Sequence, residues 1–206
     1  MSVKRFLQGM VRERAPGPAP SFNVYDVFRV LELIAKEGAV GRGKISKSLG
    51  LGEGATRTLL SRLSEERLIS ISRRGCAFLE KGRKIWEDLK ASIAKKVELK
   101  EENELTLARY NIAVLVKGRG ANVRKGLEQR DASVRAGAKG ATTILIEGGK
   151  MILPAVSTNL ERDYPKAFKQ IAESLKPENG DVVIICSADS LREAEYGAIA
   201  AAWTVI

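Results

Sequence analysis

The sequence predicts an α+β chain of two domains, in which a helical domain with a small β-hairpin precedes an α/β domain of order βαββαβα. Up to about residue 96 the apolar residues mostly recur with a helical period, whereas from residue 105 short apolar runs typical of strands alternate with helical segments. Charge divides the chain at the same place. Residues 1–96 hold 20 Lys and Arg against 10 Asp and Glu, and residues 97–206 hold 15 of each. We therefore expect an N-terminal segment over 1–20, one domain over 21–96 and a second over 97–206.

Composition excludes several classes of protein. At 206 residues and 44% hydrophobic content the chain can build two cores. It has no apolar run of the ~20 residues that span a bilayer, and its first residues lack the apolar stretch of a signal peptide, so we expect a soluble cytoplasmic protein. Histidine is absent, and Cys76 and Cys186 are the only cysteines. Common zinc sites and histidine-based catalysis are thereby excluded; we expect no cofactor or metal, and both cysteines buried in strands.

The first helices follow from apolar spacing and Pro/Gly punctuation. Residues 3–13 predict a short amphipathic helix, and the segment APGPAPS after it favours an extended polyproline strap. A second helix begins beyond Ser21 and ends at Gly38. Its apolar stripe consists of Val24, Val27, Phe28, Leu31 and Ile34. This helix is expected to support the two helices that follow it.

Residues 43–84 hold the most informative pattern. GRGKISKSLG predicts a short helix that Gly50 can end in a left-handed conformation. A helix over residues 53–67 follows, with Leu59 and Leu63 on its buried face and Thr58 and Ser61 opposite. LISIS and CAFLE then predict two strands joined by the basic tip SRRG, and a helix beginning near residue 81 closes the core. This layout is that of a winged helix-turn-helix.

The polar face of the second helix and the basic tip predict contacts with double-stranded DNA. We expect Arg57, Thr58 and Ser61 to face base edges in the major groove. The expected phosphate contacts are Lys44, Lys47, Arg62, Arg73 and Arg74. The alternative is an ordinary solvated basic face, but the helix-turn-helix, the wing and the charge excess occur together, which favours DNA binding. Such a function needs no catalytic residue, and we expect no enzyme.

The same segments carry a resemblance to a known family. APGPAPSF followed by a helix, GRGKISKSLGLGEGATRTLLSRLSEERLIS, SRRG and LEKGRKIW resemble the winged-helix half of small archaeal transcriptional regulators with a poorly characterised C-terminal domain. The similarity extends through KGLEQRDASVRAGAKGATTILIEGGKMILP and so covers most of the chain. It implies a regulator and no ligand. One departure is Gly52-Glu53-Gly54, where Ser or Thr would normally cap the recognition helix.

The C-terminal half predicts four strands and three helices. The strands are TLARYNIAVLVKG, ATTILIEG, KMILPAV and DVVIICSA, with a hairpin across Gly148-Gly149. Because IAVLV and VVIIC are continuously apolar, we expect a mixed sheet with helices on both sides; the alternative is a two-layer ferredoxin-like sandwich. The last helix, residues 191–203, is nearly all apolar. Its Ala198, Ala201 and Ala202 would allow close approach in a twofold homodimer, with the helix around residues 86–93 as the competing interface.

Three features of this half predict a pocket for an anionic small-molecule effector. The first is the Gly-rich loop with Lys117, Arg119 and Asn122 before a helix N-terminus. The second is Arg130, which falls inside the apolar stripe of a predicted helix over residues 121–138, beside Asp131. The third is a strand end. It contributes Cys186, Ser187 and Asp189.

Each feature also has an ordinary structural interpretation: a flexible turn, a structural ion pair, and a cap by Asp189 or Ser190 on the next helix. Two other functions therefore stay open. One is an enzyme that acts on a phosphorylated small molecule through Lys117, Arg119, Arg130 and Asp131. The other is a winged helix that binds a protein.

Overall fold

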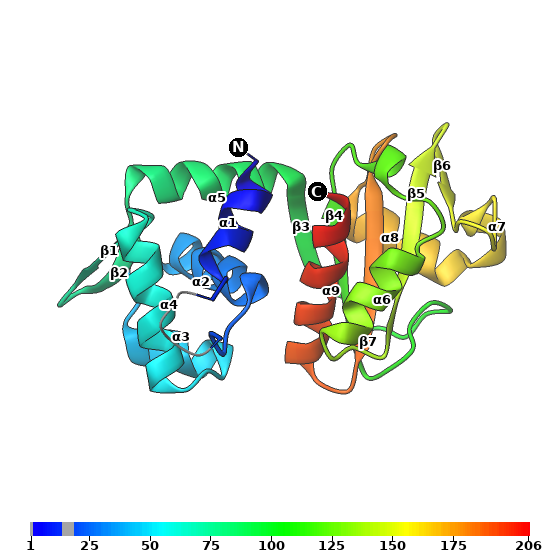
Figure 1. Cartoon of the computed structure of the whole chain (residues 1–206). Helices are drawn as coiled ribbons and strands as arrows, with labels where there is room; N and C mark the ends of the chain where they lie inside the picture. The colour runs from blue at the N-terminus through cyan, green and yellow to red at the C-terminus, as the bar shows by residue number, and fades with distance from the viewer. Residues whose placement is uncertain (1, 14–18) are drawn as a thin grey trace. The chain divides into compact units, whose positions relative to one another are not determined.

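The structure is a computed structural model that describes residues 2–13 and 19–206 (Figure 1). It divides into two compact units, with the boundary between Leu89 and Lys90. This boundary lies earlier than the expected 96/97, because residues 93–98 form a strand of the second unit. Residues 14–18, which include most of the expected Pro-rich strap, lie outside the described residues.

The first unit contains the expected helices and hairpin. Its elements are α1 (Val3–Met10), α2 (Val24–Glu37), α3 (Arg42–Leu49), α4 (Glu53–Glu65), β1 (Ile69–Ser72) and β2 (Gly75–Phe78), followed by α5 (Glu80–Ser92). Strands β1 and β2 pair antiparallel. Buried apolar residues from α2, α3 and α4, including Leu31, Ile45 and Leu59, form the core. The periodicity in the sequence therefore located the core faces of these helices correctly.

Local chemistry explains where these elements begin and end. Asn23 caps α2 in a reciprocal capping box with Asp26. Gly50 ends α3 with φ 62°, the left-handed conformation that glycine adopts without strain. Gly82 in α5 lies so close to the hairpin that an added Cβ would overlap the carbonyl oxygen of Leu68. A side chain at position 82 would therefore separate α5 from the start of β1.

The second unit is built on a five-stranded sheet of order β3-β4-β7-β5-β6. The strands are β3 (Ile93–Glu98), β4 (Tyr110–Val116), β5 (Gly140–Glu147), β6 (Lys150–Ile152) and β7 (Val182–Ala188). All neighbouring strands are antiparallel, so the prediction of a mixed sheet is wrong. The strands joined by helices do run parallel to each other, but each such pair is separated by one strand of opposite direction. β7 lies between β4 and β5, and β5 lies between β6 and β7.

Helices cover both faces of this sheet (Figure 1). On one face, α7 (Leu160–Asp163) and α8 (Pro165–Leu175) pack against alternate residues of the strands, such as Leu115 and Ile185. On the other face α9 (Leu191–Val205) packs on β4 and β7, and α6 (Leu127–Arg135) packs on α9 and β5. Burial on both sides explains the continuously apolar strands and excludes the two-layer alternative.

Two further predictions differ from the structure. Strand β3 was not predicted at all. The expected helix over residues 121–138 is shorter: a 3₁₀ turn, η1 (Gly120–Asn122), is followed by irregular backbone, and α6 begins only after Gly126, whose φ is 78°. Among the described residues no helix is long and apolar enough to cross a membrane.

Candidate nucleic-acid interface

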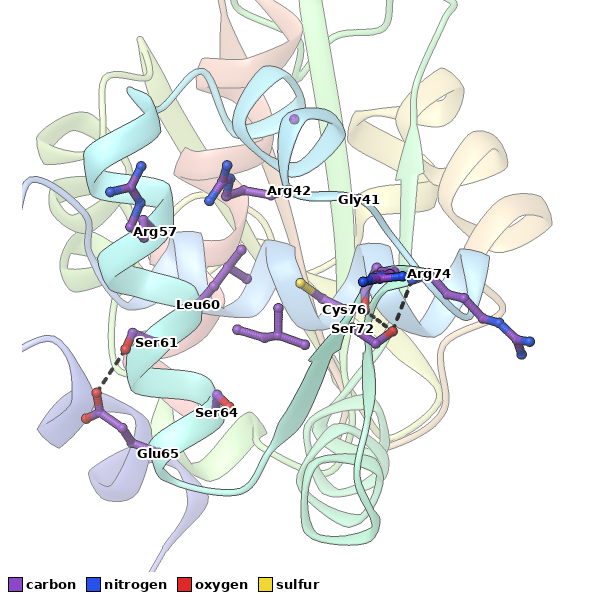
Figure 2. A pocket seen from close by; sticks show the side chains of 14 residues that line it. Gly41, Arg42, Arg57, Leu60, Ser61, Ser64, Glu65, Ser72, Arg74 and Cys76 are labelled. Carbon is purple, nitrogen blue, oxygen red and sulfur yellow. Dashed lines mark hydrogen bonds between the residues drawn. The ribbon is translucent and has the colours of Figure 1, made fainter.

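A cleft of about 680 Å³ lies in the first unit between the start of α3, helix α4 and the β1–β2 hairpin (Figure 2). Leu60 and Cys76 line it and are buried, and Ile71 of β1 lines it with 55% of its surface exposed. Ser61 and Ser64 line the α4 side. The cleft therefore has an apolar floor and a polar rim.

Four arginines border this cleft from three different elements. Arg42 comes from the start of α3, Arg57 from α4, and Arg73 and Arg74 from the hairpin tip. All four are exposed, and none forms an ion pair within residues 2–13 and 19–206. In Figure 2 the side chains of Arg42 and Arg57 lie at the same end of the cleft. Glu65 also lines the cleft, and its carboxylate accepts a hydrogen bond from the Ser61 hydroxyl at 3.0 Å. The four arginines outnumber this carboxylate, so the rim is attractive to an anion.

The local sequence explains why these side chains face the cleft. On α4, Arg57 and Ser61 are four residues apart and share one face, whereas Leu59 and Leu63 are buried on the opposite side. The hairpin tip turns at Gly75, whose φ of 118° is in the region that favours glycine. An added Cβ there would lie 2.8 Å from the Val40 backbone. Glycine at this position thus lets the hairpin pack closely beside the start of α3.

The N-termini of α3 and α4 are both preceded by glycine. Gly41 and Gly52 hold the extended N-cap conformation, but neither helix has a side-chain cap. The Gly52-Glu53-Gly54 departure noted in the sequence is thus a real absence of the usual Ser or Thr cap. The first backbone N–H groups of α4 consequently have no side-chain acceptor in the described residues.

The predicted DNA-contacting residues fall into three groups. Arg57, Ser61, Arg73 and Arg74 meet at the cleft, together with Arg42, which the sequence reasoning missed. The signal for Arg42 in the sequence is its position directly after Gly41, as the first residue of α3, because there the N-terminus of this helix approaches the next helix. Thr58 and Lys47 are exposed but do not line the cleft, and Lys44 is exposed with its ammonium 2.6 Å from the Glu37 carboxylate.

Arg62 is not a surface cation, so its prediction as a phosphate contact is wrong. It is 7% exposed. Its guanidinium donates hydrogen bonds to the carbonyl oxygens of Met10 and Arg12, at 2.7 and 2.9 Å, and lies over the ring of Phe22. The side chain leaves α4 at the edge of the buried face. There it satisfies carbonyl groups at the C-terminal end of α1.

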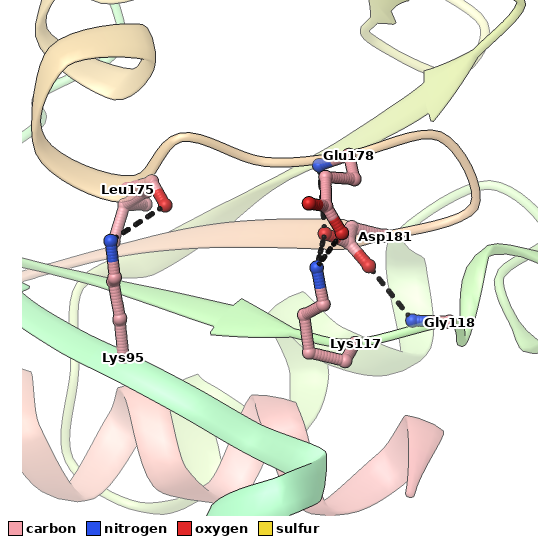
Figure 3. Close-up of polar contacts among 6 residues, drawn as sticks. All are labelled: Lys95, Lys117, Gly118, Leu175, Glu178 and Asp181. Atoms are coloured by element: carbon pink, nitrogen blue, oxygen red, sulfur yellow. Dashed lines mark hydrogen bonds and ion pairs between the residues drawn. The ribbon is translucent and has the colours of Figure 1, made fainter.

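In the second unit the Gly-rich loop does hold an anion, but the anion is a carboxylate of the same chain (Figure 3). The buried Asp181 accepts hydrogen bonds from the Lys117 ammonium at 2.9 Å, from the Gly118 N–H at 2.9 Å and from the Glu178 N–H at 2.8 Å. Burial alone would raise the pKa of Asp181, but these hydrogen bonds outweigh it and lower that pKa. Lys117 is therefore occupied within the fold.

The expected convergence at an effector pocket does not occur. Arg130 is exposed and binds the neighbouring Asp131 at 2.9 Å, because the helix turns its 127–134 side outward. Ser187 pairs in register with Asn111, whereas the Gly-rich loop follows Val116 at the other end of β4. The remaining predicted residues have separate partners or positions. Asn122 donates to the Val205 carbonyl, Asp189 pairs with Lys139, Arg119 is exposed, and Cys186 is buried.

Both cysteines are free and buried in strands, as expected. Burial raises the pKa of the Cys76 thiol, and it raises the pKa of the Cys186 thiol to about 12. Neither sulfur therefore has the thiolate character of a nucleophile near neutral pH. Among the described residues, no group of three or more Cys, Asp or Glu side chains is placed to hold a metal ion.

Comparison with known proteins assigns both halves to families. Residues 23–84 match the family model described as "PH0730-like, N-terminal domain", and residues 107–205 match "Domain of unknown function (DUF4443)". The chain is also similar to the solved structure of hypothetical protein PH0730 from Pyrococcus horikoshii OT3. Identity is 30%, the alignment covers 90% of this chain and 93% of that one, and the TM-score is 0.71. The chain belongs to the PH0730-like family.

The PH0730-like match supports the archaeal part of the resemblance and the two-domain organisation. The family model for the N-terminal domain spans α2, α3, α4 and the hairpin, and so includes the whole cleft. No curated protein matches the chain.

Proposed function

We propose that this protein is a DNA-binding transcriptional regulator whose first unit acts as a winged helix. In this proposal α4 is the recognition helix, β1–β2 is the wing, and the duplex lies against the cleft between them. One observation supports it above all. Arg42, Arg57, Arg73 and Arg74 come from three elements to one cleft and have no carboxylate partners in the described part of the chain.

Each side chain has a role that matches its position. Arg57, Thr58 and Ser61 project from the exposed face of α4 and are proposed to face base edges. Arg42, Arg73, Arg74 and Lys47 are proposed to contact phosphates. Lys44 would contribute less, because its ammonium already forms an ion pair with the Glu37 carboxylate. No catalytic group is needed.

The second unit is proposed to serve dimerisation. The effector site loses its support, because the groups predicted to form it are occupied separately or lie at opposite ends of the sheet. The enzyme alternative loses support for the same reason, since Lys117, Arg119, Arg130 and Asp131 are not brought together around a cavity in the described residues. No observation favours the protein-binding alternative over the binding of DNA at the arginine cleft.

The proposal is tested by selecting duplex sites from a random pool with the full chain and measuring affinity for the selected site and for an unrelated duplex. We expect Arg57→Ala to cost about 1–3 kcal/mol at the selected site and to relax sequence preference. Arg42→Ala and Arg74→Ala should weaken both duplexes by similar factors and reduce the salt dependence of binding.

Arg83→Ala is the matched control, because Arg83 is an exposed arginine of α5 that does not line the cleft. It should leave both affinities nearly unchanged. If Arg83→Ala and Arg57→Ala weaken binding equally, the cleft is not the interface. If the selected pool shows no sequence preference, the protein does not read bases.

A further inference from the structure

Helix α6 packs with its polar side inward. Gln129 and Ser133 are 2% and 0% exposed, whereas Leu127 and Val134 on the opposite side are 49% and 48% exposed. The Gln129 side-chain N–H donates to the Thr204 hydroxyl, and the Ser133 hydroxyl donates to the Arg130 carbonyl. The buried Gln129 Oε1 has no hydrogen-bond partner in the described residues. Apart from Ala132, the buried side of this helix is polar, while leucine and valine are exposed, which is the reverse of the usual pattern and makes the exposed side a candidate interaction surface.

The exposed face of α6 has a definite charge order. At about 100° per residue, Leu127 and Val134 lie nearly in line, and Glu128 and Arg135 both lie on one flank of that line. Both charged residues are exposed, and neither has an ion-pair partner in the described residues. Arg130 and Asp131 lie between the two apolar residues and pair with each other.

We propose that this face of α6 binds the same face of a second copy of the chain, with the two helices antiparallel about a twofold axis near residues 130–131. In an antiparallel pair centred there, Leu127 faces the second copy's Val134, and the reverse contact forms at the same time. A twofold axis keeps each flank opposite the equivalent flank. Glu128 therefore lies near Arg135 of the second copy, and both charges that lack partners in the single chain gain one.

The charge order is the reason to choose a second copy over an unlike partner. At the start of the helix the apolar Leu127 is followed by the carboxylate of Glu128. At its end the apolar Val134 is followed by the oppositely charged guanidinium of Arg135. In the antiparallel arrangement Leu127 and Glu128 are complementary to Val134 and Arg135 of the second copy. Arg130 and Asp131 face their own equivalents at the axis, where the ion pair within each chain offsets their charges. A purely basic or purely apolar face would carry no such preference.

The surface predicted for dimerisation from the sequence is excluded by burial. Ala198, Ala201 and Ala202 of α9 are each 0% exposed, and α9 packs on β4 and β7. Gly197 is needed inside the unit, because an added Cβ would lie 2.5 Å from the Cys186 sulfur and 2.7 Å from the Ala138 Cβ. The small residues of α9 therefore serve the close approach of elements within the chain.

A nine-residue helix is roughly 14 Å long, and two such faces bury much less than the ~800 Å² per partner of a standard interface. We therefore expect a weak dimer, with a dissociation constant on the order of 10–100 µM, rather than an obligate one. This inference does not depend on DNA binding. It can be tested on the free protein.

The decisive experiment is sedimentation equilibrium of the full chain without DNA over a wide concentration range. Glu128→Arg and Arg135→Glu should each weaken dimerisation roughly tenfold, because each puts two like-charged pairs in contact. The double variant E128R/R135E should restore dimerisation to near the original level. Since both positions are exposed, circular dichroism should show unchanged folding in all three variants.

A cross-linking experiment tests the register. The double variant L127C/V134C should form disulfide-linked dimers under mild oxidation, since the facing positions lie within disulfide reach. Leu127→Cys alone should not, because the two equivalent positions are about 10 Å apart along the helix axis. The control K169C/E173C places two cysteines at exposed positions of α8 and should cross-link no faster than random collision allows.

A chain that stays monomeric at all concentrations would overturn the inference. So would a dimer that is unaffected by the α6 charge variants, or one that the double charge swap fails to restore. Loss of DNA binding with dimerisation intact would instead contradict the proposed function and leave this inference standing.

Discussion

At the scale of single residues, Asp181 makes the clearest prediction. Its carboxylate is buried and accepts three hydrogen bonds, which hold its pKa below the ordinary value. Asp181→Asn should therefore destabilise the second unit by about 1–3 kcal/mol at neutral pH, because Lys117 and two backbone N–H groups lose a charged acceptor.

The pH dependence follows from the direction of that shift. A lowered pKa contributes stability that is present above the unfolded-state value, near 4, and is lost as pH falls through the folded-state value. Urea unfolding at pH 7 and pH 3, followed by Trp203 fluorescence in a Trp86→Phe background, should show a smaller acid effect in Asp181→Asn. Glu173→Gln is the control, since that carboxylate of α8 is exposed and forms no ion pair in the described residues. An equal acid effect with and without Asp181 would contradict the assignment.

Single residues also show where sequence reasoning stops. Arg57 and Arg62 look equivalent in the sequence, five positions apart on α4, yet one borders the cleft and the other is buried beneath residues 10–12. The helical period places Arg62 at the edge of the buried face, but only the tertiary path of α1 decides that carbonyl groups meet it there. Lys117 was predicted to bind an anionic effector, but its ammonium pairs with the Asp181 carboxylate of the same chain. Its partner, 64 residues away in the chain, could not be inferred.

At the scale of elements, the junction between the hairpin and α5 depends on Gly82. Gly82→Ala should destabilise the first unit by about 2 kcal/mol or more, because the new methyl group meets the Leu68 backbone, which cannot move like a flexible side chain. This loss exceeds the ~1 kcal/mol that alanine gains over glycine in a helix. Thermal unfolding measures it. Gly54→Ala, which meets nothing within 4 Å, should be neutral or slightly stabilising; similar losses at both positions would show that close packing at Gly82 is not the cause.

Elements with a strong period and clear end residues were predictable, and those without were not. Helices α2, α3 and α4 follow their apolar spacing. Strand β3 was missed because it starts at Ile93, directly after α5 ends at Ser92, with no Gly or Pro between them, and a register shift interrupts its pairing. The start of α6 was misplaced because the left-handed Gly126 breaks the helix that the apolar pattern suggested.

At the scale of the whole molecule, apolar runs predict how deeply a strand is buried but carry no information on its direction. That is why coverage of both sheet faces could be predicted while the antiparallel order could not. The charge asymmetry between the two halves of the sequence is also present between the two units of the structure. With the boundary at Leu89/Lys90, the first unit holds 17 Lys and Arg against 10 Asp and Glu, and the second holds 18 against 15.

The two proposals, DNA binding by the first unit and dimerisation through α6 of the second, together lead to a prediction for the intact chain on DNA. If the first unit reads one half-site and α6 joins two chains weakly, two half-sites on one duplex should be filled cooperatively, because the bound chains raise each other's effective concentration. The plot of log affinity against log salt should then be roughly twice as steep for the paired site as for a single half-site, since twice as many phosphates are contacted. Glu128→Arg, which leaves the cleft untouched, should keep the single-site affinity and abolish the cooperativity in titrations of both duplexes. Cooperativity that survives in Glu128→Arg would place the contact between DNA-bound chains outside α6.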